Sequence, residues 1–249
     1  MMKNMLIVLG RVFAFIILSA SAFGEPIQIV TEDYPPYNYE VNGELTGFST
    51  EVVKLIVQKL GMQAQPKLLP WARAYLIALK NKNTLLYTTT RNQERENLFK
   101  WVGPLAPRTL FLFKLKTRDD IKINSLEDAK KHRIGVVIKG AFSQNLISKG
   151  FVVGKNINQV SNEEQNIKML FLGRIDLIGN VELYMAYELK SLGLDFTQLE
   201  KVYEFPDNSS YYMAFNKKTP DTIVNSFQKA LDELKQDGTY QKIAEKYLK

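Results

Sequence analysis

The chain has 249 residues and a formal net charge of +7, with no cysteine and one histidine, His132. The lack of cysteine excludes disulfides, thiolate metal sites and cysteine nucleophiles, and a single histidine argues against a Ser-His-Asp triad or a multi-histidine metal site. The basic residues are scattered rather than gathered with aromatic residues in a patch, which argues against nucleic-acid binding.

The first 24 residues have the pattern of a secretory signal peptide. Lys3 and Arg11 precede the apolar run 12–18, and small residues follow it. This order predicts cleavage after Ala22 or Gly24. An uncleaved anchor is the weaker alternative, because the apolar run is short for a membrane span. With no cysteine to carry a lipid, the pattern predicts export to a periplasm without a lipid anchor.

The first half of the remaining chain alternates strands with helices. This order is typical of a mostly parallel sheet with helices on its faces. Two prolines and three tyrosines form the turn 32–39 after the first strand, and Ser49 or Thr50 is expected to cap the first helix. The expected elements are strands at 27–31, 67–69 and 85–90 and helices at about 49–60 and 71–79.

Aromatic and basic side chains follow the ends of these strands. Ligands of such sheets bind beyond the carboxyl ends of the strands, so these side chains are expected on one rim. A guanidinium offers a rigid fork of donors that matches a carboxylate or phosphate. On its own, the charged cluster 91–96 could equally form a solvated, ion-paired turn. The residues of this rim are Tyr34, Tyr37, Trp71, Arg73, Thr88, Thr90, Arg91 and Arg95.

The second half repeats the alternation. Ser125 starts a capped helix, a buried strand follows at 134–138, and residues 139–143 open another helix. A capping box at 161–164 starts a helix that stops at Gly173, and the strand 175–178 ends at Gly179. A strand-like run at 109–113 leads from the first half to the second, and the runs 202–205 and 211–215, separated by a polar link at 206–210, lead back. This order predicts two α/β lobes joined by two crossings.

With these elements in order, the chain resembles the extracytoplasmic solute-binding proteins of the polar amino-acid ABC transporter family, the family 3 solute-binding proteins. The resemblance rests on segments 43–61, 88–104, 125–140, 172–177 and 214–248. It implies an α/β type II periplasmic-binding-protein fold, in which each of two lobes is a mostly parallel sheet flanked by helices. The implied limits are 25–107 with 211–249 for lobe 1, 111–207 for lobe 2, and 107–111 and 207–211 for the hinge.

The resemblance also implies the parts of a ligand site. The arginine of the T-x-x-x-x-R pattern, Arg95 with Thr90, would grip the α-carboxylate of a ligand, and Tyr34 would stack on it with Trp71 as a second wall. Backbone N–H groups at 140–143 would face the anion, as a helix N-terminus does on general grounds. The complete set of candidate ligand-binding residues is Arg95, Thr90, Thr88, Tyr34, Trp71, Arg73, Gly140, Phe142, Ser143, Asn180 and Glu182.

One position departs from the family pattern. Relatives usually place a carboxylate about five residues after the aspartate of the G-R-x-D motif, here Asp176, to hold an ammonium group. That position is Val181, which lies between Asn180 and Glu182. Either Glu182 replaces the acid or the site lacks an ammonium holder. Arg73 adds a cation that indicates either a second acidic group on the ligand or a structural ion pair.

The function that the resemblance implies is binding of a small anionic or zwitterionic solute, an amino acid or related carboxylate. A monomeric receptor without cofactor or metal would deliver it to the membrane permease of an ABC transporter. Two alternatives stay open. One is an enzyme on the same scaffold, such as a prephenate-type (cyclohexadienyl) dehydratase with Glu182, Asp33 or Glu32 as acid or base. The other is a ligand-sensing module for a membrane partner.

Overall fold

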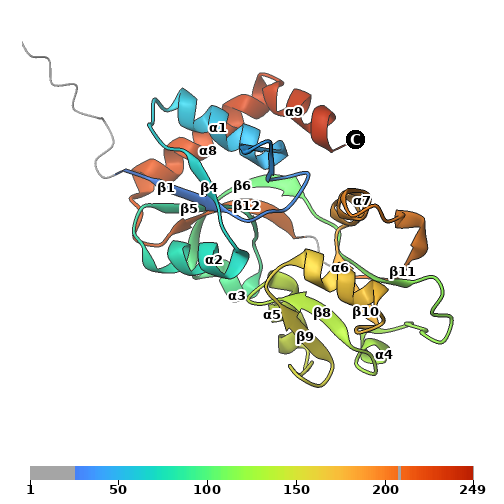
Figure 1. The fold of residues 1–249 in the computed structure, drawn as a ribbon. Helices are drawn as coiled ribbons and strands as arrows, with labels where there is room; N and C mark the ends of the chain where they lie inside the picture. The colour runs from blue at the N-terminus through green and yellow to red at the C-terminus, as the bar shows by residue number, and fades with distance from the viewer. Residues whose placement is uncertain (1–25, 207–208, 249) are drawn as a thin grey trace, which may run out of the picture.

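The computed structural model describes residues 26–206 and 209–248, so the expected signal peptide lies outside the described residues. The chain forms two five-stranded sheets, each with helices packed against it (Figure 1). We refer to the elements within residues 28–107 and 210–247 as the first unit, and to those within residues 111–204 as the second unit. The chain passes between the units twice, once after Pro107 and once after Glu204.

The first unit contains the sheet β4-β1-β5-β12-β6. Strand β1 is parallel to β4 and β5, whereas β12 is antiparallel to both β5 and β6. Helix α2 packs on one face, and α1, α8 and α9 pack on one another over the other face (Figure 1). Its strands are β1 Gln28–Thr31, β2 Tyr39–Val41, β3 Glu44–Thr46, β4 Pro66–Leu68, β5 Thr84–Thr90, β6 Phe99–Pro107 and β12 Ser210–Asn216. Its helices are α1 Phe48–Lys59, α2 Trp71–Lys80, α3 Gln93–Glu96, α8 Asp221–Gln236 and α9 Thr239–Tyr247.

The second unit contains the sheet β11-β7-β10-β8-β9. Strand β8 is parallel to β9 and β10, and β7 is antiparallel to β10 and β11. Its strands are β7 Phe111–Leu115, β8 Ile134–Val137, β9 Ile157–Val160, β10 Leu177–Asn180 and β11 Leu199–Glu204. Its helices are α4 Leu126–Ala129, α5 Ala141–Ser148, α6 Glu163–Phe171, α7 Glu182–Ser191 and the 3-10 turn η1 Phe196–Gln198.

Each sheet therefore has a single antiparallel strand among five, and the expectation of two mostly parallel sheets is confirmed. The antiparallel strands, β12 and β7, are those that directly follow a passage between the units. The expected β-α-β-α-β order is also confirmed, with boundaries that differ by a few residues. The lobe and hinge limits given above stay a prediction, since residues 25, 207–208 and 249 lie outside the described chain.

The start of α1 differs from the expectation, and the reason ties this helix to the tyrosine turn. Ser49 and Thr50 are buried inside the first turn, and Gly47 is the capping residue. The backbone N–H groups of Phe48 and Ser49 donate to the carbonyl oxygens of Pro36 and Tyr37, both at 2.9 Å. Backbone of the turn after β1 thus does what a side-chain cap would do, and this holds the turn in place.

Candidate functional site

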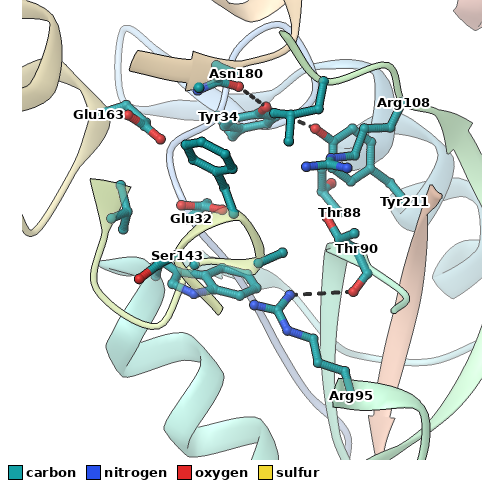
Figure 2. A pocket seen from close by; sticks show the side chains of 17 residues that line it. Glu32, Tyr34, Thr88, Thr90, Arg95, Arg108, Ser143, Glu163, Asn180 and Tyr211 are labelled. Carbon is teal, nitrogen blue, oxygen red and sulfur yellow. Dashed lines mark hydrogen bonds between the residues drawn. The ribbon is translucent and has the colours of Figure 1, made fainter. Parts of the chain in front are cut away.

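A pocket lies where the two units meet, and residues of both line it (Figure 2). The first unit supplies residues that follow β1, begin α2, end β5 and lie in α3. The second unit supplies the end of β8, the start of α5, the start of α6 and the end of β10. The lining residues are Glu32, Tyr34, Trp71, Thr88, Thr90, Arg95, Arg108, Leu110, Val137, Gly140, Ala141, Phe142, Ser143, Glu163, Gly179, Asn180 and Tyr211.

Most of the candidate ligand-binding residues from the sequence lie at this pocket. They are Tyr34, Trp71, Thr88, Thr90, Arg95, Gly140, Phe142, Ser143 and Asn180. The structure does not bring Arg73 or Glu182 there. Arg73 is exposed, since two positions along a helix rotate a side chain by about 200° from Trp71. Glu182 is also exposed and forms an ion pair with Lys201 on β11, with Nζ to Oε2 at 2.5 Å.

Arg95 is the most buried charged residue of the pocket, at 1% exposed. Its guanidinium lies 4.9 Å from the ring centre of Trp71 and 5.0 Å from that of Tyr75. Nε donates to Gln144 Oε1 at 2.9 Å, Nη2 to the Lys139 carbonyl at 3.0 Å, and Nη1 to the Thr90 carbonyl at 3.4 Å. Burial lowers the pKa of Arg95 to about 10, which leaves it charged at neutral pH.

Lys139 carries a second bond between the units. The indole Nε1 of Trp71 donates to the same Lys139 carbonyl at 2.8 Å. Lys139 has a φ of 61°, in the left-handed region that non-glycine residues rarely occupy. This conformation immediately precedes Gly140, the capping residue of α5. The first unit thus bonds the backbone that leads into the helix start predicted to face an anion.

Tyr34 also connects the two units. Its hydroxyl donates to Asn180 Oδ1 at 2.6 Å and shares a hydrogen bond with the Tyr211 hydroxyl at 2.9 Å. Its ring stacks on Tyr184 of α7 at 4.4 Å and on Tyr37 at 5.6 Å. Burial raises the pKa of Tyr34 well above its usual value, so the hydroxyl stays protonated. The rings of Tyr37 and Tyr184 therefore stack on Tyr34, the residue that the family resemblance implied would stack on the ligand.

Thr88 has an unusual backbone conformation at the pocket. Its φ is 58°, which is rare for a β-branched residue. The register between β5 and β12 shifts at this position: Thr89 pairs with Tyr212, whereas Leu86 pairs with Ala214. A shift of this kind is typical of a β-bulge. Thr88 is only 5% exposed, and within the described chain its Oγ1 has no hydrogen-bond partner. Strained backbone of this kind persists chiefly at functional sites.

Two carboxylates reach the pocket from opposite units. Glu32 directly follows β1, and Glu163 is the first residue of α6. Figure 2 shows both side chains at the pocket. Burial raises the pKa of Glu32 to about 8; the Glu163 charge adds to the rise and Arg95 opposes it. Burial also raises the pKa of Glu163 to about 7, opposed by a hydrogen bond from Asn166 and assisted by Glu188.

Sequence reasoning did not place these carboxylates, Arg108 or Tyr211 in the ligand-binding set. Glu32 follows a strand end and could have been found by the same rule that selected Tyr34; it was named only as an acid or base of an enzyme. Glu163 lies in a capping sequence, which already explained an acidic residue there. Arg108 and Tyr211 lie at the two passages between units, where no local pattern indicates a ligand.

The start of α5 completes the wall. The N-terminal end of a helix attracts anions, because its N–H groups and dipole point outward. Ser143 is buried, and its hydroxyl accepts from Gln159 Nε2 at 3.2 Å. Phe142 packs so closely on Gly179 that a Cβ there would lie 2.1 Å from the ring. This closely packed wall joins α5 to the end of β10.

The pocket therefore offers partners for both signs of charge. Two guanidinium groups and a helix N-terminus suit a carboxylate, and two carboxyl groups suit a protonated amine. In residues 26–206 and 209–248, no group of three or more histidine, cysteine or acidic side chains could hold a metal ion. In the same residues, no helix is both long and apolar enough to cross a membrane.

The sequence matches a known family over almost its whole length. Residues 27–249 match the bacterial extracellular solute-binding proteins, family 3. The chain belongs to this family. It is 28% identical over 220 residues to the probable amino-acid-binding protein YxeM of Bacillus subtilis, covering 85% of this chain and 79% of that protein. It is 25% identical over 224 residues to a probable histidine-binding protein of Campylobacter jejuni, covering 86% of this chain and 81% of that protein.

Solved structures agree with the two-unit fold of this family 3 solute-binding protein. An ancestral arginine-binding protein bound to arginine aligns with a TM-score of 0.78 at 25% identity, covering 90% of this chain and 98% of that chain. A histidine kinase sensor domain similar to periplasmic binding proteins aligns with a TM-score of 0.81 at 20% identity, covering 90% and 96%. The second likeness shows the fold alone.

Proposed function

We propose that this family 3 solute-binding protein binds a small zwitterionic amino acid, or a related carboxylate, in the pocket between its two units. The observation that carries the proposal is the presence of both guanidinium and carboxyl groups in one pocket that both units line. The names of relatives support it, since they include probable amino-acid-binding and L-cystine-binding proteins of Bacillus subtilis. A structural relative at 25% identity was solved with arginine bound.

In this proposal the units are lobes that close on the ligand. Lobe 1 is 25–107 with 211–249, lobe 2 is 111–207, and the chain between them at 107–111 and 207–211 is the hinge. The bonds from Arg95 and Trp71 to Lys139, and from Tyr34 to Asn180, join the lobes across the pocket. A ligand that contacts both lobes shifts the equilibrium toward the joined arrangement by its differential affinity.

Arg95 is the proposed anchor of the ligand carboxylate. A guanidinium has five N–H donors, and three of those of Arg95 bond protein acceptors. The remaining two, one on each Nη, are available to a carboxylate. Trp71 and Tyr75 hold the guanidinium plane, and Asn92 caps α3 by accepting from the Arg95 backbone N–H at 3.1 Å. Such preorganisation lowers the cost of fixing the side chain on binding.

We also propose where the protein is located and which membrane partner receives its solute. The N-terminal signal pattern and the extracellular family together support a periplasmic protein that is cleaved after Ala22 or Gly24. The relatives' names support delivery of the solute to the permease of an ABC transporter. We further propose that the protein binds its solute without converting it, in line with the binding functions for which its relatives are named.

A thermal-shift panel tests the proposal. Protein stripped of ligand by unfolding and refolding is heated with each of the twenty amino acids, L-cystine and a set of dicarboxylates. A ligand at one hundred times its Kd stabilises the folded state by about 2.7 kcal/mol, which raises the Tm of a chain this long by about 5–10 °C. A flat response over the whole panel contradicts the proposal. Mass spectrometry of the incubated ligand checks that it is unchanged.

A further inference from the structure

Val181 stands where the family resemblance led us to expect an acid that holds an ammonium group, and its neighbours do not replace that acid. Val181 is 4% exposed and forms the N-cap of α7. Glu182 points away to its ion pair with Lys201. A protonated amine at the pocket must therefore find its carboxylate elsewhere, because a buried ammonium without an acceptor is strongly disfavoured.

We propose that Glu163 and Glu32, with the hydroxyl of Thr88, form a subsite for a protonated primary amine that relocates the ammonium holder from the position of Val181. This inference rests on the proposed function and deepens it: the ligand is an amine-bearing amino acid rather than a simple carboxylate. The two carboxylates line the same pocket from different units, so an ammonium group held by both would join the units.

The two glutamates have acceptor capacity to spare. From the described residues, no hydrogen bond or ion pair reaches the Glu32 carboxylate, and Glu163 uses only Oε2, which accepts from Asn166 Nδ2 at 2.8 Å. Two desolvated carboxylates that repel each other gain most from a cation placed between them. The charged groups that act on the pair are Arg95, Asp33 and Glu188. Arg95 offsets part of the repulsion, whereas the two acids increase it.

Thr88 supplies an independent observation. Its Oγ1 is buried at the pocket and has no partner in the described chain, although a buried hydroxyl without a hydrogen bond is costly. The bulge that carries it keeps a β-branched residue at positive φ, and this arrangement persists at an energetic cost. A ligand N–H would satisfy the hydroxyl oxygen. An ammonium group has three N–H donors, and Glu32, Glu163 and Thr88 offer three acceptors.

The test compares Glu163→Gln with the matched control Glu164→Gln. Glu164 is the next residue of α6, is exposed, and pairs with Lys168 on the surface. The probes are the amino acid that stabilises the wild type most in the thermal-shift panel and its desamino analogue, which keeps the carboxylate and side chain. We expect Glu163→Gln to weaken amino-acid binding at least tenfold and Glu164→Gln to change it less than twofold, by titration calorimetry.

The desamino analogue separates the subsite from general damage. Wild type should bind the desamino analogue at least tenfold more weakly than the amino acid. The Glu163→Gln variant should bind the analogue with the same affinity as the wild type. Glu163→Gln removes a partly buried charge and leaves a side-chain oxygen that can accept the Asn166 hydrogen bond, so its Tm should not fall. Equal amino-acid affinity in Glu163→Gln and wild type, or equal wild-type affinity for the two probes, overturns the inference while leaving the proposed function intact. If no amino acid binds the wild type, the proposed function fails and this inference fails with it.

Discussion

The guanidinium of Arg95 donates to the backbone carbonyl of Lys139 at 3.0 Å, so a buried side chain of the first unit bonds the residue before the N-cap of α5 in the second. The same side chain stacks on Trp71 and Tyr75. It therefore links the two units and, in our proposal, also faces the ligand. Changes to Arg95 should affect stability and affinity together.

Arg95→Lys tests this double role. Lysine keeps the charge but loses the planar fork, so it cannot bond Gln144, Thr90 and Lys139 together. We expect a loss of about 1–3 kcal/mol in unfolding free energy and at least tenfold weaker amino-acid binding. Arg91→Lys is the control, because Arg91 pairs with exposed Glu96 and such pairs contribute about 0–1 kcal/mol. Urea unfolding measures the change in unfolding free energy, and titration calorimetry measures the change in affinity. Unchanged affinity in Arg95→Lys would remove Arg95 as anchor.

Trp71→Phe tests the second bond to Lys139. Phenylalanine keeps an aromatic surface for Arg95 but loses the indole N–H that reaches the carbonyl at 2.8 Å. The expected loss of unfolding free energy is about 1–2 kcal/mol. Trp101→Phe provides a comparison, since its Nε1 bond to the Glu96 carbonyl at 3.1 Å is solvent-exposed and should matter less. Equal losses of unfolding free energy in the two variants would show that the hydrogen bond between the units contributes no more to stability than the exposed one.

The pH dependence of stability tests the two glutamates. Their pKa values in the fold are about 8 for Glu32 and about 7 for Glu163, above the value of 4.5 for an unperturbed glutamate. The folded state therefore holds protons that the unfolded chain has released, and the unfolding free energy of ligand-free protein should fall as pH rises from about 5 to 8. Glu163→Gln should flatten part of this slope, as measured by urea unfolding at several pH values. An unchanged slope in the variant contradicts the environment assigned to Glu163.

The pH dependence of amino-acid binding should have the opposite sign to that of stability. A cationic amine favours the ionised carboxylates, so amino-acid affinity should rise with pH between about 5.5 and 8, and binding at pH 7 should release protons. Besides each other, the charged groups that affect the pKa values of Glu32 and Glu163 are Arg95, Asp33 and Glu188. Calorimetry in buffers of different ionisation enthalpy measures the protons released. Proton uptake at pH 7 would contradict this account.

Gly179→Ala tests the close packing of Phe142 on Gly179. A Cβ at Gly179 would lie 2.1 Å from Cε1 of Phe142, so the ring must move. Overpacking of this kind costs about 1–3 kcal/mol, and the shifted ring would enter the pocket and weaken binding. Phe142→Ala in the same chain removes the clash, so the double variant should lose less than the two single losses combined. Strict additivity in unfolding free energy would show that the two residues do not interact.

Local patterns were sufficient for the architecture but not for the partners of each side chain. Alternating strands and helices, capping residues and glycine stops predicted both sheets, and the strand-end rule selected Arg95, Trp71 and Thr90 for the rim. The N-terminus of α1 was mispredicted because its cap is the distant backbone at Pro36 and Tyr37. Arg73 was selected because it follows a strand end, although its helical phase turns it to solvent.

The remaining features of the pocket depend on contacts that no local pattern contains. Tyr34 meets Tyr211 across 177 positions of sequence and Asn180 across 146. The bulge at Thr88 arises from pairing with β12, far along the chain. Glu163 has the same sequence signature as any helix-starting acid, and only its position opposite Glu32 distinguishes it.

Titration calorimetry of stripped protein with its best amino acid tests the central claim most directly, with Arg95→Ala/Glu163→Gln measured beside the wild type. We predict one-to-one binding by the wild type and at least a hundredfold loss in the double variant, whose helical circular dichroism should be retained. No binding of any of the twenty amino acids or L-cystine by the wild type, or the same affinity in the folded double variant, would contradict the claim.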